Sequence, residues 1–158
     1  MVRTEKRIRL CTVLLILNVM LIWGNSLLPG AVSASISRFV RNVIAFLFSG
    51  GSGNVGGGGE GILRKIAHFV EFTGLGLWLS WLVRMLAAKK ALWHSLPLVS
   101  GVLVACTDET IQWFVPGRAC RLYDVGIDTL GVVTGIVIIS LIQKCQKEKI
   151  YNMEENKQ

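Results

Sequence analysis

Charged residues are scarce in this chain. Asp, Glu, Lys and Arg make up 17% of its 158 residues, while 52% are hydrophobic. An ordinary soluble domain carries about 25% charged residues, so the composition favours a membrane protein, and the length allows one domain. The four cysteines form no Cys-x-x-Cys pair, which argues against a zinc site or a disulfide framework. The glycine-rich stretch lacks the Lys-Ser/Thr that ends a phosphate-binding loop.

The basic residues do not form one continuous face. The net charge is +7, from 17 Lys and Arg against 10 Asp and Glu, and the basic residues lie at the ends of apolar segments. This arrangement is typical of membrane topology signals rather than of a DNA-binding surface. We therefore expect the lipid bilayer to be a partner and expect no nucleic acid.

Four apolar segments are candidates for membrane spans, at about residues 10–28, 63–83, 93–115 and 124–142. A helix of about 20 residues crosses the hydrocarbon core. Residues 1–9 form a basic N-terminus, and residues 144–158 form a polar tail for which we expect disorder. The first segment also resembles a cleavable signal peptide, but it exceeds the usual apolar length of about 7–15 residues. We therefore favour a retained helix.

A shorter segment between the first two spans has amphipathic spacing. Residues 33–48 carry an apolar stripe that consists of Ile36, Val40, Val43, Ile44 and Leu47, as on one helix face. The segment is too polar to span, so we interpret it as a helix in the outer membrane interface; a short helix packed on the bundle is the alternative. Residues 49–61 predict a flexible outer loop. The predicted fold is all-α: an integral membrane four-helix bundle over residues 10–143 with one interfacial helix.

The distribution of basic residues orients these spans. Eleven lie on the side that holds both termini and the connection between spans two and three, and six lie on the other side. The positive-inside rule therefore places both termini in the cytoplasm.

With this orientation, polar side chains from three spans fall at the same outer depth. They are His68, Glu71, Asp108, Glu109, Gln112, Arg118, Asp124 and Asp128. Most form pairs three or four residues apart, which project from one helix face. An ionised side chain in lipid costs about 2.5–3.5 kcal/mol. We therefore expect these faces to meet around a polar pocket that is open to the outer surface.

Such a pocket suits several kinds of chemistry. The acid–base candidates are His68, Glu71, Asp108 and Glu109, because carboxylates beside a histidine can hold or accept protons. Arg118, with Arg64 or Lys65, suits the binding of phosphate or carboxylate. A histidine with several carboxylates also suits a divalent cation, but the spacing matches no specific metal motif and we assign no metal ligands.

A purely structural network is the alternative to a ligand site. Polar groups near helix ends can fix helix packing through hydrogen bonds and ion pairs. In that interpretation Arg118 pairs with Asp124 or Asp108, and His68 is a satisfied hydrogen-bond donor.

Three segments of the chain resemble a known family. Residues 64–76 (RKIAHFVEFTGLG) resemble its K-x-x-H-x-x-E-Y-x-x-L-G segment, residues 107–118 (TDETIQWFVPGR) its D-E-x-x-Q-x-F-x-P-G-R segment, and residues 124–131 (DVGIDTLG) its D-x-x-x-N-x-x-G segment. Asn25-Ser26 at the end of the first span also fits. In this order the segments identify the chain as similar to the VanZ-like membrane family over about residues 23–135. Phe72 replaces a common Tyr, and Asp128 replaces a common Asn, which makes Asp128 a candidate for carrying a proton.

The resemblance implies a small, four-helix protein of the bacterial cytoplasmic membrane that acts in the cell envelope. The family's namesake is linked to low-level resistance to teicoplanin and related lipoglycopeptides. The ligand-binding candidates are Lys65, Gln112, Arg118, Asp124, Asp128 and Ser26. We rank first a pocket for an envelope lipid, cell-wall precursor or lipoglycopeptide, second a membrane enzyme that acts on such a precursor or lipid, and third a structural subunit. The sequence indicates no particular cofactor.

Overall fold

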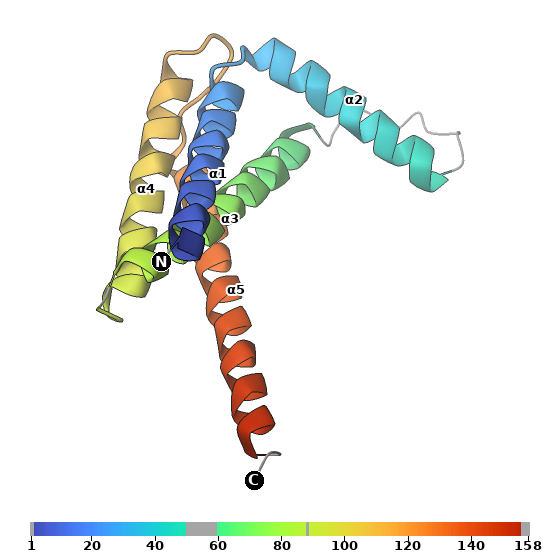
Figure 1. The fold of residues 1–158 in the computed structure, drawn as a ribbon. Helices are drawn as coiled ribbons and strands as arrows, with labels where there is room; N and C mark the ends of the chain where they lie inside the picture. The colour runs from blue at the N-terminus through green and yellow to red at the C-terminus, as the bar shows by residue number, and fades with distance from the viewer. Residues whose placement is uncertain (1, 50–59, 88, 156–158) are drawn as a thin grey trace.

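The computed structural model describes residues 2–49, 60–87 and 89–155, which form five helices and no strand. The helices are α1 (Val2–Ser26), α2 (Gly30–Ser49), α3 (Glu60–Leu86), α4 (Leu92–Trp113) and α5 (Leu122–Glu155). Helices α1, α3 and α4 pack together with the first half of α5, while α2 projects away from this group (Figure 1). The all-α class predicted from the sequence is confirmed.

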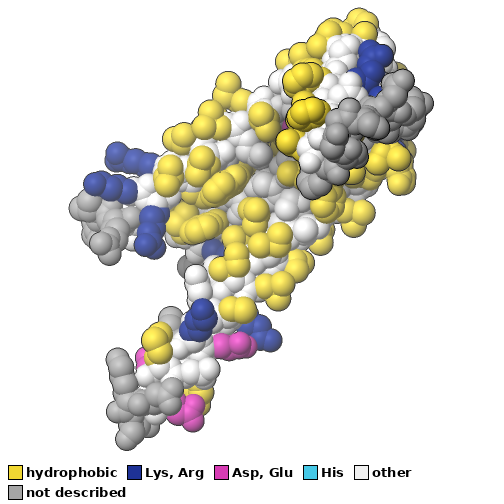
Figure 2. Space-filling model, turned by 90° about the vertical axis from the view of Figure 1, so that its right-hand side faces the viewer, with side chains coloured by type: hydrophobic (Ala, Val, Ile, Leu, Met, Phe, Trp, Pro, Cys, Tyr) yellow, Lys and Arg dark blue, Asp and Glu magenta, His cyan; other side chains and the backbone are white. Residues whose placement is uncertain are grey.

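Three of the helices are long and apolar enough to cross a membrane, namely α1, α3 and α5. Their outer faces carry large exposed hydrophobic side chains, for example Leu17 on α1, Val70 on α3 and Leu141 on α5. Figure 2 shows hydrophobic side chains over the body of the helices, with Lys and Arg gathered mainly towards their ends. A soluble protein would leave such a surface in water, so these features indicate a multi-pass membrane protein.

The helices continue beyond the apolar segments that predict them. Helix α1 begins at Val2 rather than near residue 10, and α5 continues to Glu155. The polar tail is therefore helical up to Glu155, where the sequence predicts disorder. Lys, Glu and Gln are good helix formers, and extending an existing helix avoids the cost of nucleation. Most of the predicted glycine-rich loop, residues 50–59, lies outside the described part of the chain.

Glycines allow α3 and α5 to pack with their backbones close together. A Cβ atom at Gly131 would lie 2.6 Å from the carbonyl oxygen of Phe69, and one at Gly135 would overlap the carbonyl oxygen of Thr73. Small residues at such a crossing are typical of membrane helix pairs. Asp128 precedes Gly131 by three residues and therefore lies on the same side of α5. The glycine contact thus turns Asp128 towards α3.

The apolar core lies between α1, α3, α4 and α5. It consists of Ile22, Phe72, Leu75, Ala105, Val132 and Ile136. Each of these four helices contributes at least one of the six side chains. The polar residues considered below lie at one end of this core.

The corner between α1 and α2 is tied to the turn between α4 and α5. The backbone N–H of Gly30 donates to the carbonyl oxygen of Pro116 at 3.0 Å. Arg118 donates from Nε to the carbonyl of Leu28 at 3.1 Å and from Nη2 to the carbonyl of Asn25 at 2.8 Å. The two bonds from Arg118 add donors to carbonyl groups at and just after the end of α1, where the helix itself supplies few.

Candidate functional site

All the site candidates from the sequence gather at one end of the helix group, where α1 and α4 end and α3 and α5 begin. Helix α1 contributes Ser26, α3 contributes Lys65, His68 and Glu71, α4 contributes Asp108, Glu109 and Gln112, the following turn contributes Arg118, and α5 contributes Asp124 and Asp128. Hydrogen bonds and ion pairs link most of these side chains to a neighbouring helix or turn.

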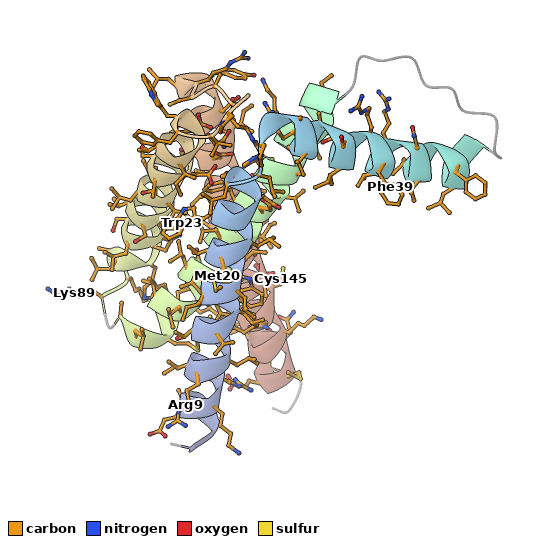
Figure 3. All side chains as sticks on the ribbon, turned by 90° about the horizontal axis from the view of Figure 1, so that it is seen from above. Arg9, Met20, Trp23, Phe39, Lys89 and Cys145 are labelled. Atoms are coloured by element: carbon orange, nitrogen blue, oxygen red, sulfur yellow. The ribbon has the colours of Figure 1, made fainter. Side chains whose placement is uncertain are left out.

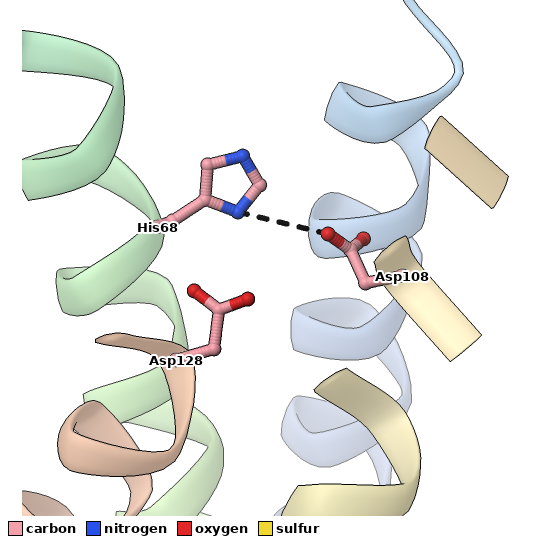
Figure 4. Close-up of side chains that lie close together, drawn as sticks. All are labelled: His68, Asp108 and Asp128. Carbon is pink, nitrogen blue, oxygen red and sulfur yellow. Dashed lines mark ion pairs between the residues drawn. The ribbon is translucent and has the colours of Figure 1, made fainter. Parts of the chain in front are cut away.

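Three side chains from three helices form the centre of the cluster. His68, Asp108 and Asp128 converge on one point between α3, α4 and α5 (Figure 4). Nδ1 of His68 lies 3.8 Å from Oδ2 of Asp108, and one nitrogen or oxygen atom from each residue lies within 4.8 Å of the other two. Asp108 is 0% exposed and Asp128 is 2% exposed. Two carboxylates are thus buried side by side, next to one imidazole.

Neutral polar groups hold this centre in place. Nε2 of Gln112 donates to Oδ2 of Asp108 at 2.9 Å and to Oγ of Ser26 at 3.3 Å. Both Gln112 and Ser26 are buried. The ring of His68 stacks on that of Phe72, with 6.5 Å between the ring centroids. The amide orients Asp108 but brings no positive charge to it.

Glu71 lies towards α1. Nδ2 of Asn25 donates to Oε1 of Glu71, and Oε2 of Glu71 is buried without a hydrogen-bond partner among the described residues. Asn18 donates to the backbone carbonyl of Glu71 at 3.4 Å. The end of α1 therefore fixes the position of this carboxyl group beside His68.

Ion pairs and backbone contacts form the rim. Nζ of Lys65 lies 3.6 Å from Oδ1 of Asp124 and 4.6 Å from the centre of the Tyr123 ring. Oε2 of Glu109 accepts a hydrogen bond from the backbone N–H of Arg121 at 2.7 Å. Glu109 therefore contributes to the turn that leads into α5, and Lys65 offsets the charge of Asp124.

Arg118 does not form the ion pair with Asp108 or Asp124 that the structural interpretation expects. Its guanidinium binds the backbone carbonyls at the end of α1, because the turn with Gly117 at φ +75° directs the chain back over that end. Burial and the positive charge of Arg64 lower the pKa of Arg118, while the carboxylates of Asp108 and Glu109 act in the opposite direction. Arg64 and Arg118 also line one cavity together.

Two cavities adjoin the cluster, and both are lined in part by His68 and Arg64. A cavity of about 10 Å³ lies against Gln112 and Asp128. A larger one of about 100 Å³ is lined by Asn25, Leu28, Ser33, Ile36, Ser37, Arg64, Ala67, His68, Glu71 and Arg118. The sequence interpretation missed Ser33, Ser37 and Asn18. The two serines are four residues apart on α2, and this spacing, which places both on one helix face, was the signal that could have identified them.

A family model described as VanZ/LLP1 matches residues 11–143 of the chain. This range includes all the polar site residues described above. The chain belongs to the VanZ/LLP1 family. The VanZ-like resemblance inferred from three sequence segments is thereby confirmed. No curated protein and no solved structure matches this VanZ/LLP1 chain.

Proposed function

We propose that this VanZ/LLP1 protein acts in the bacterial cell envelope by binding the phosphate-bearing headgroup of an envelope lipid or lipid-linked cell-wall precursor. The observation that carries the proposal is the cavity of about 100 Å³, because Arg64 and Arg118 both line it. A guanidinium group offers a fork of donors that matches phosphate oxygens. An anion bound between the two arginines would offset their positive charges.

The cavity offers further donors for such a headgroup. The hydroxyl groups of Ser33 and Ser37 and the side chain of Asn25 line it. Nη1 of Arg118 is buried without a hydrogen-bond partner in the described chain. A bound phosphate would satisfy this donor, whose burial otherwise costs about 1–3 kcal/mol.

Helix α4 is proposed as the fourth membrane span, alongside the three helices that qualify by length and hydropathy. Its buried face holds Asp108, Glu109 and Gln112, and these polar residues lower the hydropathy of the whole helix. Its exposed face is mainly apolar, with Leu103 63% exposed and Val99 57% exposed, and the hydroxyls of its two exposed threonines bond to the helix's own backbone. A helix with this pattern turns its apolar face to the lipid and its polar face to the three neighbouring spans.

Helix α2 is proposed to lie in the outer membrane interface. Phe39, Phe46 and Leu47 are each at least 69% exposed, and Arg38 and Arg41 lie on the same helix. Such a helix can bury its apolar side chains among the lipid tails and keep the charged ones at headgroup level. Because Ser33 and Ser37 belong to α2, the cavity would then open at that level.

The proposed orientation places this end of the molecule outside the cell. Arg9 and Lys89 lie away from α2 (Figure 3), so basic residues mark the opposite, cytoplasmic end. Both termini are then cytoplasmic. The packing of Ile22 and Ser26 of α1 into the core supports a retained first helix.

Lipid co-purification tests headgroup binding. We expect Arg64→Gln to lower the amount of phospholipid or lipid-linked precursor that mass spectrometry detects on the purified protein by several-fold. Arg121→Gln is the matched control, because Arg121 is exposed and lines neither cavity adjoining the cluster. Equal lipid content in Arg64→Gln, Arg121→Gln and the unmodified protein would overturn the proposal. A teicoplanin susceptibility assay on the same strains tests whether binding extends to lipoglycopeptide resistance.

Acid–base catalysis on the bound precursor is the second candidate function. It is favoured by one observation: His68 and Glu71 line the same cavity as the two arginines. The candidate groups then have a substrate position beside them. Incubation of the purified protein with labelled lipid-linked precursors should give a product that Glu71→Gln does not form. No product at any pH, with or without divalent metal ions, would exclude this function.

A further inference from the structure

We propose that His68, Asp108 and Asp128 bind a divalent metal ion of the Mn²⁺ or Zn²⁺ class. This site goes beyond headgroup binding and does not depend on it. The two sites share His68, but the metal site adds Asp108 of α4 and Asp128 of α5, neither of which lines the arginine-lined cavity.

The distances between His68, Asp108 and Asp128, called the trio below, are those of groups that share an ion. One candidate ligand atom from each residue lies within 4.8 Å of the other two. Metal–ligand bonds of about 2.0–2.4 Å place two ligands of one ion up to roughly 4–5 Å apart. The 3.8 Å between Nδ1 of His68 and Oδ2 of Asp108 is too long for a hydrogen bond. The separation leaves room for an ion between the two groups.

Each member of the trio also carries a buried atom without a hydrogen-bond partner. These atoms are Nδ1 of His68, Oδ1 of Asp108 and Oδ2 of Asp128 within the described residues. Asp108 and Asp128 are at least 98% buried, with exposures of 0% and 2%. Buried polar atoms are nearly always satisfied in native proteins. Each of the three helices therefore contributes a side chain with a buried atom that is available to a common ligand.

The nearby side chains offset the charges of His68, Asp108 and Asp128 only in part, because none that the structure describes forms a cationic ion pair with either carboxylate. Lys65 pairs with Asp124, and Arg118 binds backbone carbonyls, so among the described residues no Lys or Arg forms an ion pair with Asp108 or Asp128. A buried, uncompensated carboxylate is costly. A divalent ion would offset both carboxylates. A proton on Asp128 would remove one charge but would leave Nδ1 of His68 without a partner.

The space and the donor types fit a single metal ion. The cavity of about 10 Å³ touches His68 and Asp128, and that volume holds about one water-sized particle. One imidazole and two carboxylates suit Zn²⁺ or Mn²⁺, and three protein ligands leave a coordination position open. Gln112 donates to Oδ2 of Asp108 and so orients a ligand, as outer-sphere partners of metal ligands do.

Metal titration of the full-length protein in detergent tests this site. After removal of metal with a chelator, we expect the unmodified protein to bind one equivalent of Mn²⁺ or Zn²⁺, measured by calorimetry and by the electron paramagnetic resonance of bound Mn²⁺. Asp128→Asn and His68→Gln should weaken binding by at least about tenfold, since loss of even an outer-sphere partner costs roughly 10–100-fold. Asn is the common residue at this position in the VanZ-like segment that residues 124–131 resemble, so Asp128→Asn should fold. A thermal melt checks this.

Two matched controls make the result specific. Glu148→Gln removes an exposed carboxylate further along α5, and His94→Gln alters the other histidine of the chain, which is exposed. Both should keep the affinity of the unmodified protein. No bound metal in the unmodified protein, or equal losses in Glu148→Gln and Asp128→Asn, would overturn the site. Headgroup binding is read through the lipid content of Arg64→Gln and metal binding through Asp128→Asn, whose residue does not line the arginine-lined cavity, so either proposal can fail alone.

Discussion

At the scale of single residues, Arg118 joins two parts of the chain that are 90 residues or more apart in sequence. Its guanidinium donates to the carbonyls of Leu28 and Asn25, and it also lines the larger cavity. One planar group therefore serves packing and, in our proposal, phosphate binding. The fork geometry of arginine allows both roles, whereas an ammonium group is a point charge with less directional donors.

Arg118→Lys should therefore lower the free energy of unfolding by about 1.5–3 kcal/mol, the range for hydrogen bonds to a charged group. Lysine keeps the charge but cannot reach both carbonyls with the same geometry. Thermal or denaturant unfolding in detergent, followed by circular dichroism, measures the change. Arg121→Lys serves as the control and should unfold like the unmodified protein. Equal stability of all three proteins would show that the two hydrogen bonds contribute nothing measurable.

At the scale of secondary-structure elements, the crossing of α3 and α5 determines which residues meet. The glycines at 131 and 135 bring the two backbones together, and this contact fixes the rotation of α5 about its axis. Asp128 faces His68 for that reason. A wider crossing would separate the imidazole from the carboxylate.

A methyl group at this crossing tests its importance. Gly135→Ala would place a Cβ atom against the carbonyl of Thr73, and overpacking of this kind costs about 1–3 kcal/mol. Gly126→Ala is the control on the same helix, because open space surrounds its Cβ position. The control should be neutral or more stable by up to about 1 kcal/mol, since alanine favours helix. Melting curves of both variants measure the difference, and a Gly135→Ala protein as stable as Gly126→Ala would contradict the packing argument.

The helices were largely predictable from the sequence, but their ends and rotations were not. Apolar segments identify the middle of each helix, whereas the polar ends of α1 and α5 carry no apolar signal and still extend the helix. The polar candidates were predictable as a group, because α4 ends and α3 and α5 begin at the same end of the helix group. Their pairing was not, since the approach of α3 and α5 at Gly135 and the turn at Gly117 depend on tertiary packing. Lys65 therefore pairs with Asp124, and Arg118 binds carbonyl groups.

At the scale of the whole molecule, the native cysteines allow a test of the proposed orientation. Cys120 lies in the turn before α5, near the candidate site, and Cys145 is exposed on the last part of α5. The proposed topology puts Cys120 outside the cell and Cys145 in the cytoplasm.

Two variants, in which either Cys120 or Cys145 is the only cysteine left, should therefore react differently with a thiol reagent added from outside. In intact cells without an outer barrier, a membrane-impermeant maleimide should react with the protein that keeps Cys120. The protein that keeps Cys145 should react only after permeabilisation. Gel-shift or mass measurement reads the labelling, and a variant with no cysteine gives the background. The reverse pattern would invert the proposed orientation and place the polar pocket on the cytoplasmic side.

The bond from Gly30 to Pro116 and the tight contact between Gly30 and Gly117 have a mechanical consequence. Helix α2 starts at Gly30, so its first turn and the turn before α5 are clamped together. A change in the tilt of α2 would therefore also move the turn that carries Arg118, and with it one wall of the arginine-lined cavity.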